Sequence, residues 1–117
     1  MNFSGKSDEE IASIANPIWE CLVQGSNEND YGKFSRHFSR ESFKAMPEEE
    51  LKRQTEATHH VMGLVSPDRE FIGCIRRESG VTVLWKCRFT NGKGERLGQL
   101  TLDEEDGEFK AFAAFVG

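Results

Sequence analysis

Four β-strands are predicted by residues 69–116, REFIGCIRRESGVTVLWKCRFTNGKGERLGQLTLDEEDGEFKAFAAFV. Three turn signals divide this stretch, namely Ser79-Gly80, Asn91-Gly92 and Asp106-Gly107. Asn-Gly and Asp-Gly favour short hairpins because both central residues tolerate a positive φ angle. We therefore expect an antiparallel meander with strands at about 69–78, 81–90, 95–105 and 108–116.

The turns also predict which residues share a face of the sheet, because residues paired across neighbouring strands point to the same side. A two-residue turn at Ser79-Gly80 sets Cys74 opposite Trp85 and Ile72 opposite Cys87. The resulting inner face is mostly apolar and has no carboxylate, so helices should cover it. Its predicted members are Ile72, Cys74, Arg76, Val81, Val83, Trp85, Cys87, Phe89, Arg96, Gly98, Leu100, Leu102, Phe109, Ala111, Ala113 and Phe115.

The outer face of the sheet is predicted to be mixed in character. An apolar patch with a polar rim is typical of an interaction site, so we expect a homodimer that forms sheet to sheet. An alternative, in which the ends of the chain or a helix cover this face, stays open. The predicted interface residues are Ile75, Leu84, Lys86, Leu97, Phe112, Ala114 and Val116.

The first predicted helix spans about residues 8–24, where apolar side chains recur at helical spacing. Ser7 or Asp8 can cap it. Pro17 lacks a backbone donor, so we expect a kink or a break just before it, and Gly25 should end the helix.

Two further helices are predicted before the sheet. A short one should span about 30–38, with Phe43 filling the core after it. A third should begin at Pro47 and reach about Met62, near Gly63. Proline suits the first position of a helix, and the carboxylates that follow it suit the positive end of the helix dipole.

Length and composition limit the class of protein. The chain of 117 residues suits a single domain, residues 1–117. A net charge of -5 argues against general binding to nucleic acid or to anionic membranes, so we expect neither partner. The start of the chain has no apolar secretion signal, and no stretch approaches the roughly 18 apolar residues of a membrane span. We therefore expect a cytoplasmic protein.

The cysteines and histidines predict no metal site. Three cysteines cannot all pair within one chain, and none has the spacing of a zinc site or a CxxC motif, which fits a reducing compartment. His59 and His60 are neighbours on a predicted helix, so their side chains point about 100° apart and cannot hold one metal ion.

The order of the elements, helices and then a meander, resembles the nuclear transport factor 2-like superfamily, whose cone-shaped α+β fold is shared with ketosteroid isomerase. Residues 14–51 look like a bacterial branch of it. The resemblance implies three N-terminal helices on a curved four-stranded sheet, a homodimer, and a cavity between sheet and helices; it implies no reaction. The matching residues are Trp19, Leu22, Gly25, Asp30-Tyr31-Gly32-Lys33-Phe34, Ser42-Phe43-Lys44, Pro47-Glu48, Gly63 and Arg69.

Two interpretations of the cavity wall stay open. As a ligand site it would offer an aromatic floor, soft sulfur contacts and one cation for a carboxylate. As core it would hold Trp85 against cysteines, with Arg76 reaching the rim. The predicted wall comprises Tyr31, His59, Cys74, Arg76, Trp85 and Cys87.

We predict no catalytic residue and no cofactor. A mechanism of the ketosteroid isomerase type needs a carboxylate base in the cavity and an acidic donor. Tyr31 could donate, but the inner face has no Asp or Glu, and Asp30 suits a helix cap. The expected function is a non-catalytic binding module, for a small apolar or carboxylate-bearing molecule or for a partner protein. The alternative is a small cofactor-independent isomerase, dehydratase or cyclase.

Overall fold

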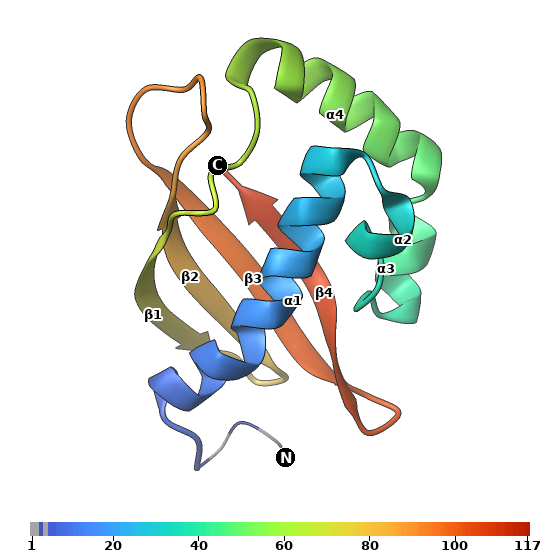
Figure 1. Ribbon diagram of the computed structural model, residues 1–117. Helices are drawn as coiled ribbons and strands as arrows, with labels where there is room; N and C mark the ends of the chain where they lie inside the picture. Colours follow the sequence, from blue (N-terminus) through green and yellow to red (C-terminus); the bar gives the residue numbers. More distant parts are fainter. Residues whose placement is uncertain (1–2, 4) are drawn as a thin grey trace.

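The structure is a computed structural model that describes Phe3 and residues 5–117. Within these residues the fold is α+β, with four helices followed by four antiparallel strands in one sheet. Helix α1 crosses one face of the sheet, while α2, α3 and α4 gather beside β4 (Figure 1). The elements are α1 (Asp8–Glu28), α2 (Tyr31–Phe34), α3 (Arg40–Ala45), α4 (Glu48–Met62), β1 (Glu70–Arg76), β2 (Val81–Cys87), β3 (Arg96–Glu105) and β4 (Glu108–Val116).

Helix α1 begins at the predicted cap. The Ser7 hydroxyl accepts from the Glu10 amide, and the Glu10 carboxylate accepts in return from the Ser7 amide. Of the kink or break predicted at Pro17, the break is wrong, and so is the stop at Gly25, because the helix continues to Glu28. Asn29 caps its end with a φ of 55°. The buried apolar stripe of α1 on the sheet offsets a proline that costs about 3 kcal/mol inside a helix. Among the described residues, no helix is both long enough and apolar enough to cross a membrane.

The predicted second helix at 30–38 is wrong in its extent. Asp30 caps the single turn of α2 by accepting from the Lys33 amide, and the chain then turns. Helix α3 was not predicted; the Ser39 hydroxyl starts it by accepting from the Ser42 amide. The described residues therefore contain four helices in place of three.

Phe43 on α3 was predicted to fill the core, and this prediction is wrong. The side chain is 50% exposed. Its ring packs edge-on against Tyr31 and Phe38 at the surface. Helix α4, by contrast, begins after Pro47 and ends at Gly63 as predicted.

The order β1-β2-β3-β4 confirms the predicted meander. Asp106 and Gly107 take φ angles of 54° and 81°, and Glu105 pairs with Glu108, so this hairpin has the predicted two-residue turn. Trp85 lies opposite Gly98, so β2 and β3 share their inner face as predicted. The short turn predicted at Asn91-Gly92 is wrong, because the connection is 88–95 and neither Asn91 nor Gly92 takes a positive φ.

The first hairpin differs from the prediction. Arg76 lies opposite Val81, so the connection is 77–80, and Cys74 lies opposite Val83 and not Trp85. A two-residue turn of the type that Asn-Gly forms needs a positive φ at both central residues. Gly80 takes a φ of 83° but Ser79 does not take a positive φ, so the predicted two-residue turn does not form.

A β-bulge in β1 also moves two predicted side chains. The register shifts between Phe71 and Gly73, so that Phe71 lies opposite Trp85 on the inner face. Ile72, predicted to be inward, is exposed. Alternation alone does not show where one extra residue reverses a strand.

A second bulge changes β4. Leu102 pairs with Ala111, but Thr101 pairs with Ala113, which leaves Phe112 as the extra residue. The strand beyond it is reversed: Ala113 and Phe115 lie on the outer face, not the inner face as predicted. Two predicted outer residues, Ala114 and Val116, instead lie on the helical side, so the predicted interface loses them.

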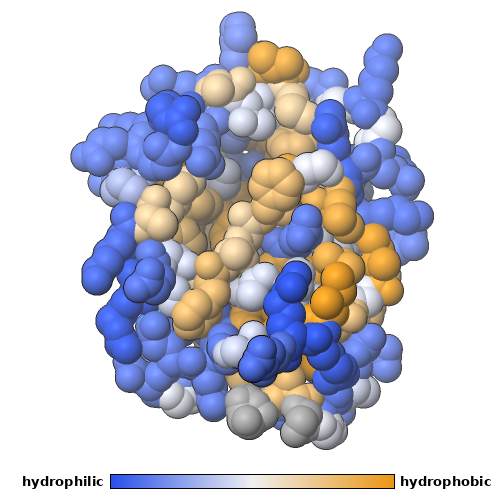
Figure 2. Space-filling model, turned by 180° about the vertical axis from the view of Figure 1, so that it is seen from behind, coloured by the Kyte–Doolittle hydropathy of each residue, from blue (hydrophilic) through white to orange (hydrophobic). Residues whose placement is uncertain are grey.

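The outer face keeps an apolar surface of different composition. Figure 2 shows apolar side chains across the middle of this face, with hydrophilic side chains around and between them. Phe115 is 62% exposed on this face, which has lost the Ala114 and Val116 side chains to the helical side. Lys86 is paired with Glu70 and Glu95, each at 3.8 Å. We call Ile75, Leu84, Leu97 and Phe115 the outer patch.

Candidate functional site

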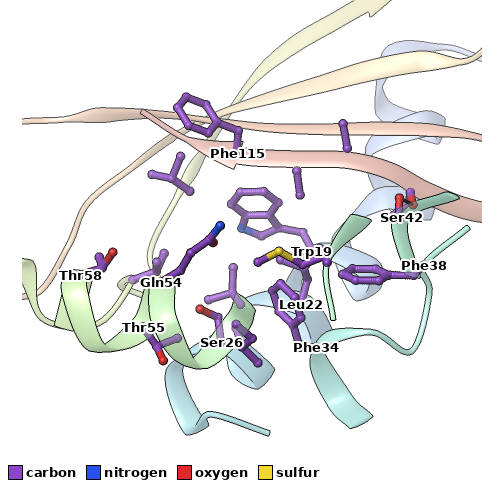
Figure 3. A pocket seen from close by; sticks show the side chains of 18 of the residues that line it. Trp19, Leu22, Ser26, Phe34, Phe38, Ser42, Gln54, Thr55, Thr58 and Phe115 are labelled. Carbon is purple, nitrogen blue, oxygen red and sulfur yellow. Dashed lines mark hydrogen bonds between the residues drawn. The ribbon is translucent and has the colours of Figure 1, made fainter. Parts of the chain in front are cut away.

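A cavity of about 780 Å³ lies between α4 and the second half of β4, and it is partly open to solvent. Helix α1 forms its floor. Figure 3 shows Trp19 of α1 and Gln54 of α4 pointing into it, with Phe115 on the other side of β4. We call this cavity the α4–β4 groove and define it by Trp19, Leu22, Phe34, Gln54, Ala114 and Val116.

The small side chains of β4 leave the groove unfilled. Ala111 and Ala114 lie on the helical side of the strand and contribute to its lining. Ala114 lies on the helical side of the sheet and is nevertheless exposed, because no helix covers it. Without the bulge at Phe112, the larger Phe115 would lie opposite Gly98 on the helical side, in the place of Val116, and would fill part of the space.

Helix α4 is tethered at both ends. At its start, the Tyr31 hydroxyl donates to the Met46 carbonyl at 2.7 Å. Beyond its end, the Asn27 side chain donates to the Val65 carbonyl at 2.9 Å and accepts from the Val65 amide at 3.0 Å. Within α4, the Leu51 side chain is buried. The helical wall of the groove is thus held by contacts outside β4.

The walls of the groove are mainly apolar and carry few charges. Gln54, Thr55 and Thr58 present uncharged polar groups from α4. The charged or titratable side chains in the lining are Glu41, Arg53 and His59, and Arg53 is paired with Glu50. An apolar ligand, rather than an ionic one, suits such walls.

Trp85 and Cys87 lie in the core, away from the groove. Trp85 is 1% exposed, and its ring packs on Trp19 with 4.7 Å between centroids. Arg69 lies across the ring at 5.7 Å and donates to the Asn16 side chain at 2.8 Å. Burial raises the pKa of the Cys87 thiol.

Arg76 ties the start of the chain to the sheet. Its guanidinium donates to the Phe3 and Lys6 carbonyls at 3.0 and 2.8 Å, and to the Asp8 carboxylate at 2.8 Å. Burial, followed by the charge of Asp8, raises the pKa of the Cys74 thiol to about 11. A thiol with this pKa is protonated at neutral pH and is a poor nucleophile.

Tyr31 also acts as structure in this fold. Desolvation, with smaller contributions from Glu48 and Glu49, raises the pKa of its phenol, whose proton is held by the Met46 carbonyl. Six residues were predicted to bind a ligand. His59 is among the residues that line the groove, and the other five are not. No group of three metal-ligating side chains is brought together within the described part of the chain.

Most of the groove was missed because it depends on tertiary packing. One signal was present in the sequence, a strand containing Ala111, Ala113 and Ala114. Alanine is depleted in strands because it packs little surface. Three of them in one predicted strand could have indicated an unfilled space beside it.

Comparisons with known proteins give a likeness of fold. No family model matches the chain, and no curated protein matches it. The solution structure of RPA3114, a SEC-C motif containing protein from Rhodopseudomonas palustris, is similar with a TM-score of 0.52. It shares 10% identity with this chain, and the match covers 90% of each chain.

These findings overturn the family predicted from the sequence. Membership of the nuclear transport factor 2-like superfamily is wrong, since a SEC-C motif protein is among the structures similar to this chain and no family model supports that assignment. Helices followed by a β-meander is an arrangement that unrelated α+β proteins share, so it carries little information about the family.

Proposed function

We propose that this protein is a non-catalytic binding module that takes an apolar ligand in the α4–β4 groove. The observation that carries the proposal is an apolar cavity of about 780 Å³ with one wall held in place by tethers. Ligand sites are typically preformed clefts of about 300–1,000 Å³ lined by apolar side chains with a few polar groups.

The chemistry of the groove supports binding over catalysis. An isomerase of the type considered above needs a carboxylate base close to an acidic donor. The Tyr31 hydroxyl donates to the Met46 carbonyl, and Glu41 is an exposed residue of the lining. Neither group is held against the other by any contact within the described residues.

An uncharged fluorescent probe, N-phenyl-1-naphthylamine, tests the proposal. We expect its emission to rise and saturate, with energy transfer from Trp19 in the groove floor. Ala114→Leu adds three carbons to the cavity side of β4, and these occupy space that the probe would otherwise fill. Each methylene of the probe that is no longer buried costs about 0.8 kcal/mol, so its affinity should fall about tenfold or more.

Gln99→Leu is the matched control, because Gln99 lies opposite Phe115 on the outer face of the sheet. It should leave binding of the probe unchanged. A wild-type protein that gives no saturable binding, or an Ala114→Leu variant that binds as well as wild type, would contradict the proposal.

We also propose a homodimer formed through the outer patch, as predicted from the sequence. The proposal is supported by three apolar side chains that are more than one-third exposed on the same face, Ile75, Leu97 and Phe115. The charge of Lys86 beside them is balanced by Glu70 and Glu95. A second copy would thus meet an apolar surface with few unpaired charges.

Leu84→Glu tests the dimer by light scattering. The glutamate would be buried in the interface without a partner, so the variant should be a monomer at concentrations where wild type is dimeric. Val61→Glu is the control, since Val61 is also an apolar side chain and is 70% exposed, but it lies on α4 and not on the outer face of the sheet. An unchanged mass for Leu84→Glu would exclude this face.

A further inference from the structure

The outer edge of β4 forms one side of the groove. Strand β4 is the last in the order β1-β2-β3-β4, so one of its sides has no strand beside it. Leu97 and Gly117 exchange two hydrogen bonds of 3.0 Å, and bonded and non-bonded pairs alternate along an antiparallel ladder. The backbone amides and carbonyls of Ala114 and Val116 therefore point away from β3, toward the groove side of the edge.

The same edge already pairs with another segment at one position. The Ala111 amide donates to the His37 carbonyl at 2.7 Å, and the Ser39 amide donates to the Ala111 carbonyl at 3.1 Å. Phe38 thereby forms a parallel bridge with Ala111. Helix α3 then leads the chain away, so within the described residues no hydrogen bond continues this pairing at Ala114 or Val116.

This part of the edge lacks the usual protection. Exposed edges carry lysine, proline or inward-pointing charges that prevent pairing with other chains. Residues Phe112–Val116 contain no charge and no proline. The other edge, β1, carries Glu70 and Arg76.

We propose that the α4–β4 groove binds an extended peptide segment of a partner protein, which adds to the edge of β4 as a fifth strand. The inference rests on the proposed function and names the ligand of that site. The segment continues the pairing present at Ala111 and satisfies the amides and carbonyls of Ala114 and Val116. At about 3.3 Å per residue, the edge Phe112–Val116 offers about 17 Å of pairing.

The walls specify the side chains of this segment. Residues of the added strand that lie beside Ala114 and Val116 point into the groove, toward Trp19 and Leu22. Alternate residues point to the outer side, near Phe115. The polar side chains that face the groove from α4, Gln54 and Thr58, are uncharged, and the rest of the wall is mainly apolar. We therefore expect apolar side chains at the positions of the peptide that point into the groove.

The test uses a library of acetylated, amidated peptides of about seven residues, with Val, Ile, Leu or Phe at alternate positions and Thr or Lys between them. Binding is measured by displacement of N-phenyl-1-naphthylamine and by calorimetry. We expect a subset of the library to bind at one site. N-methylation of the amides that face β4 should weaken binding about tenfold for each bond lost, while methylation of the intervening amides should not.

Ala114→Pro removes the edge amide from the protein itself. Because that amide points away from β3, the substitution removes no bond of the existing ladder, and proline is tolerated at such edge positions. The variant should fold and lose more affinity for the peptides than for the naphthylamine. Both probes meet the added ring carbons of proline, but only the peptides lose a backbone hydrogen bond, which is equivalent to about a further tenfold. Should Ala114→Pro not fold, the N-methyl series on wild type gives the same answer.

The outcomes separate this inference from the proposed function. Naphthylamine binding without any peptide binding would overturn the added strand and keep the apolar site. Peptides that bind equally well with and without N-methylation would also overturn the added strand, since their backbone amides would then make no hydrogen bonds to β4. Failure of both probes would overturn the proposed function. A dimer that Ala114→Pro converts to monomer would show that a second copy occupies the edge, which also overturns the inference.

Discussion

Replacing Trp85 with alanine should lower the free energy of unfolding by about 3–5 kcal/mol, as for large aromatic side chains deleted from cores. The Trp85 ring packs on Trp19 at 4.7 Å and lies under the Arg69 guanidinium at 5.7 Å. Its deletion would leave a cavity at the centre of the core and would remove the aromatic partner of Arg69. Guanidinium unfolding followed by circular dichroism measures the loss.

Two control variants make this measurement specific. Trp85→Phe keeps a ring on Trp19 and should lose less stability than Trp85→Ala. Val61→Ala removes an apolar side chain that is 70% exposed on α4, and it should change stability by no more than about 1 kcal/mol. A loss below about 1 kcal/mol for Trp85→Ala would contradict its place in the core.

Gly25→Ala should also destabilise the protein, although alanine is the better helix former by about 1 kcal/mol. A Cβ at Gly25 would lie 2.5 Å from the Phe34 Cα and closer still to its amide nitrogen. These are backbone atoms, so α2 must move away from α1. We expect a net loss of about 1–3 kcal/mol, typical of overpacked sites.

Gly32→Ala is the matched control for Gly25, because a Cβ there meets only the Asp30 carboxylate oxygen at 3.6 Å, an ordinary contact. It should be neutral or slightly stabilising in the same unfolding experiment. Equal or higher stability of Gly25→Ala relative to wild type would show that α2 does not lie against α1 as described.

The features that were predictable from the sequence are those with a local cause. The Asp106-Gly107 turn follows from two residues that accept a positive φ, and the Ser7 cap and the Pro47 start follow from backbone donors at helix ends. The face that β2 and β3 share could be predicted from alternation, because neither strand contains a bulge where they pair.

The features that were missed depend on contacts between distant segments. Gly25 was interpreted as a helix stop, but it is needed for the close approach of Phe34. The bulge at Ile72 exchanges the faces predicted for the start of β1, and the bulge at Phe112 exchanges those predicted for the end of β4. Neither bulge is marked in the alternation of apolar and polar residues. The candidate groove depends on the second bulge, which turns Ala114 inward, so it could not be located before the register of β4 was known.

The tethers of α4 at Met46 and Val65 have a further consequence. A helix fixed at its two ends gives the groove a set width before anything enters it. The conformational entropy lost on association therefore falls mainly on the incoming molecule, and a rigid occupant should gain more affinity than a flexible one with the same contact area.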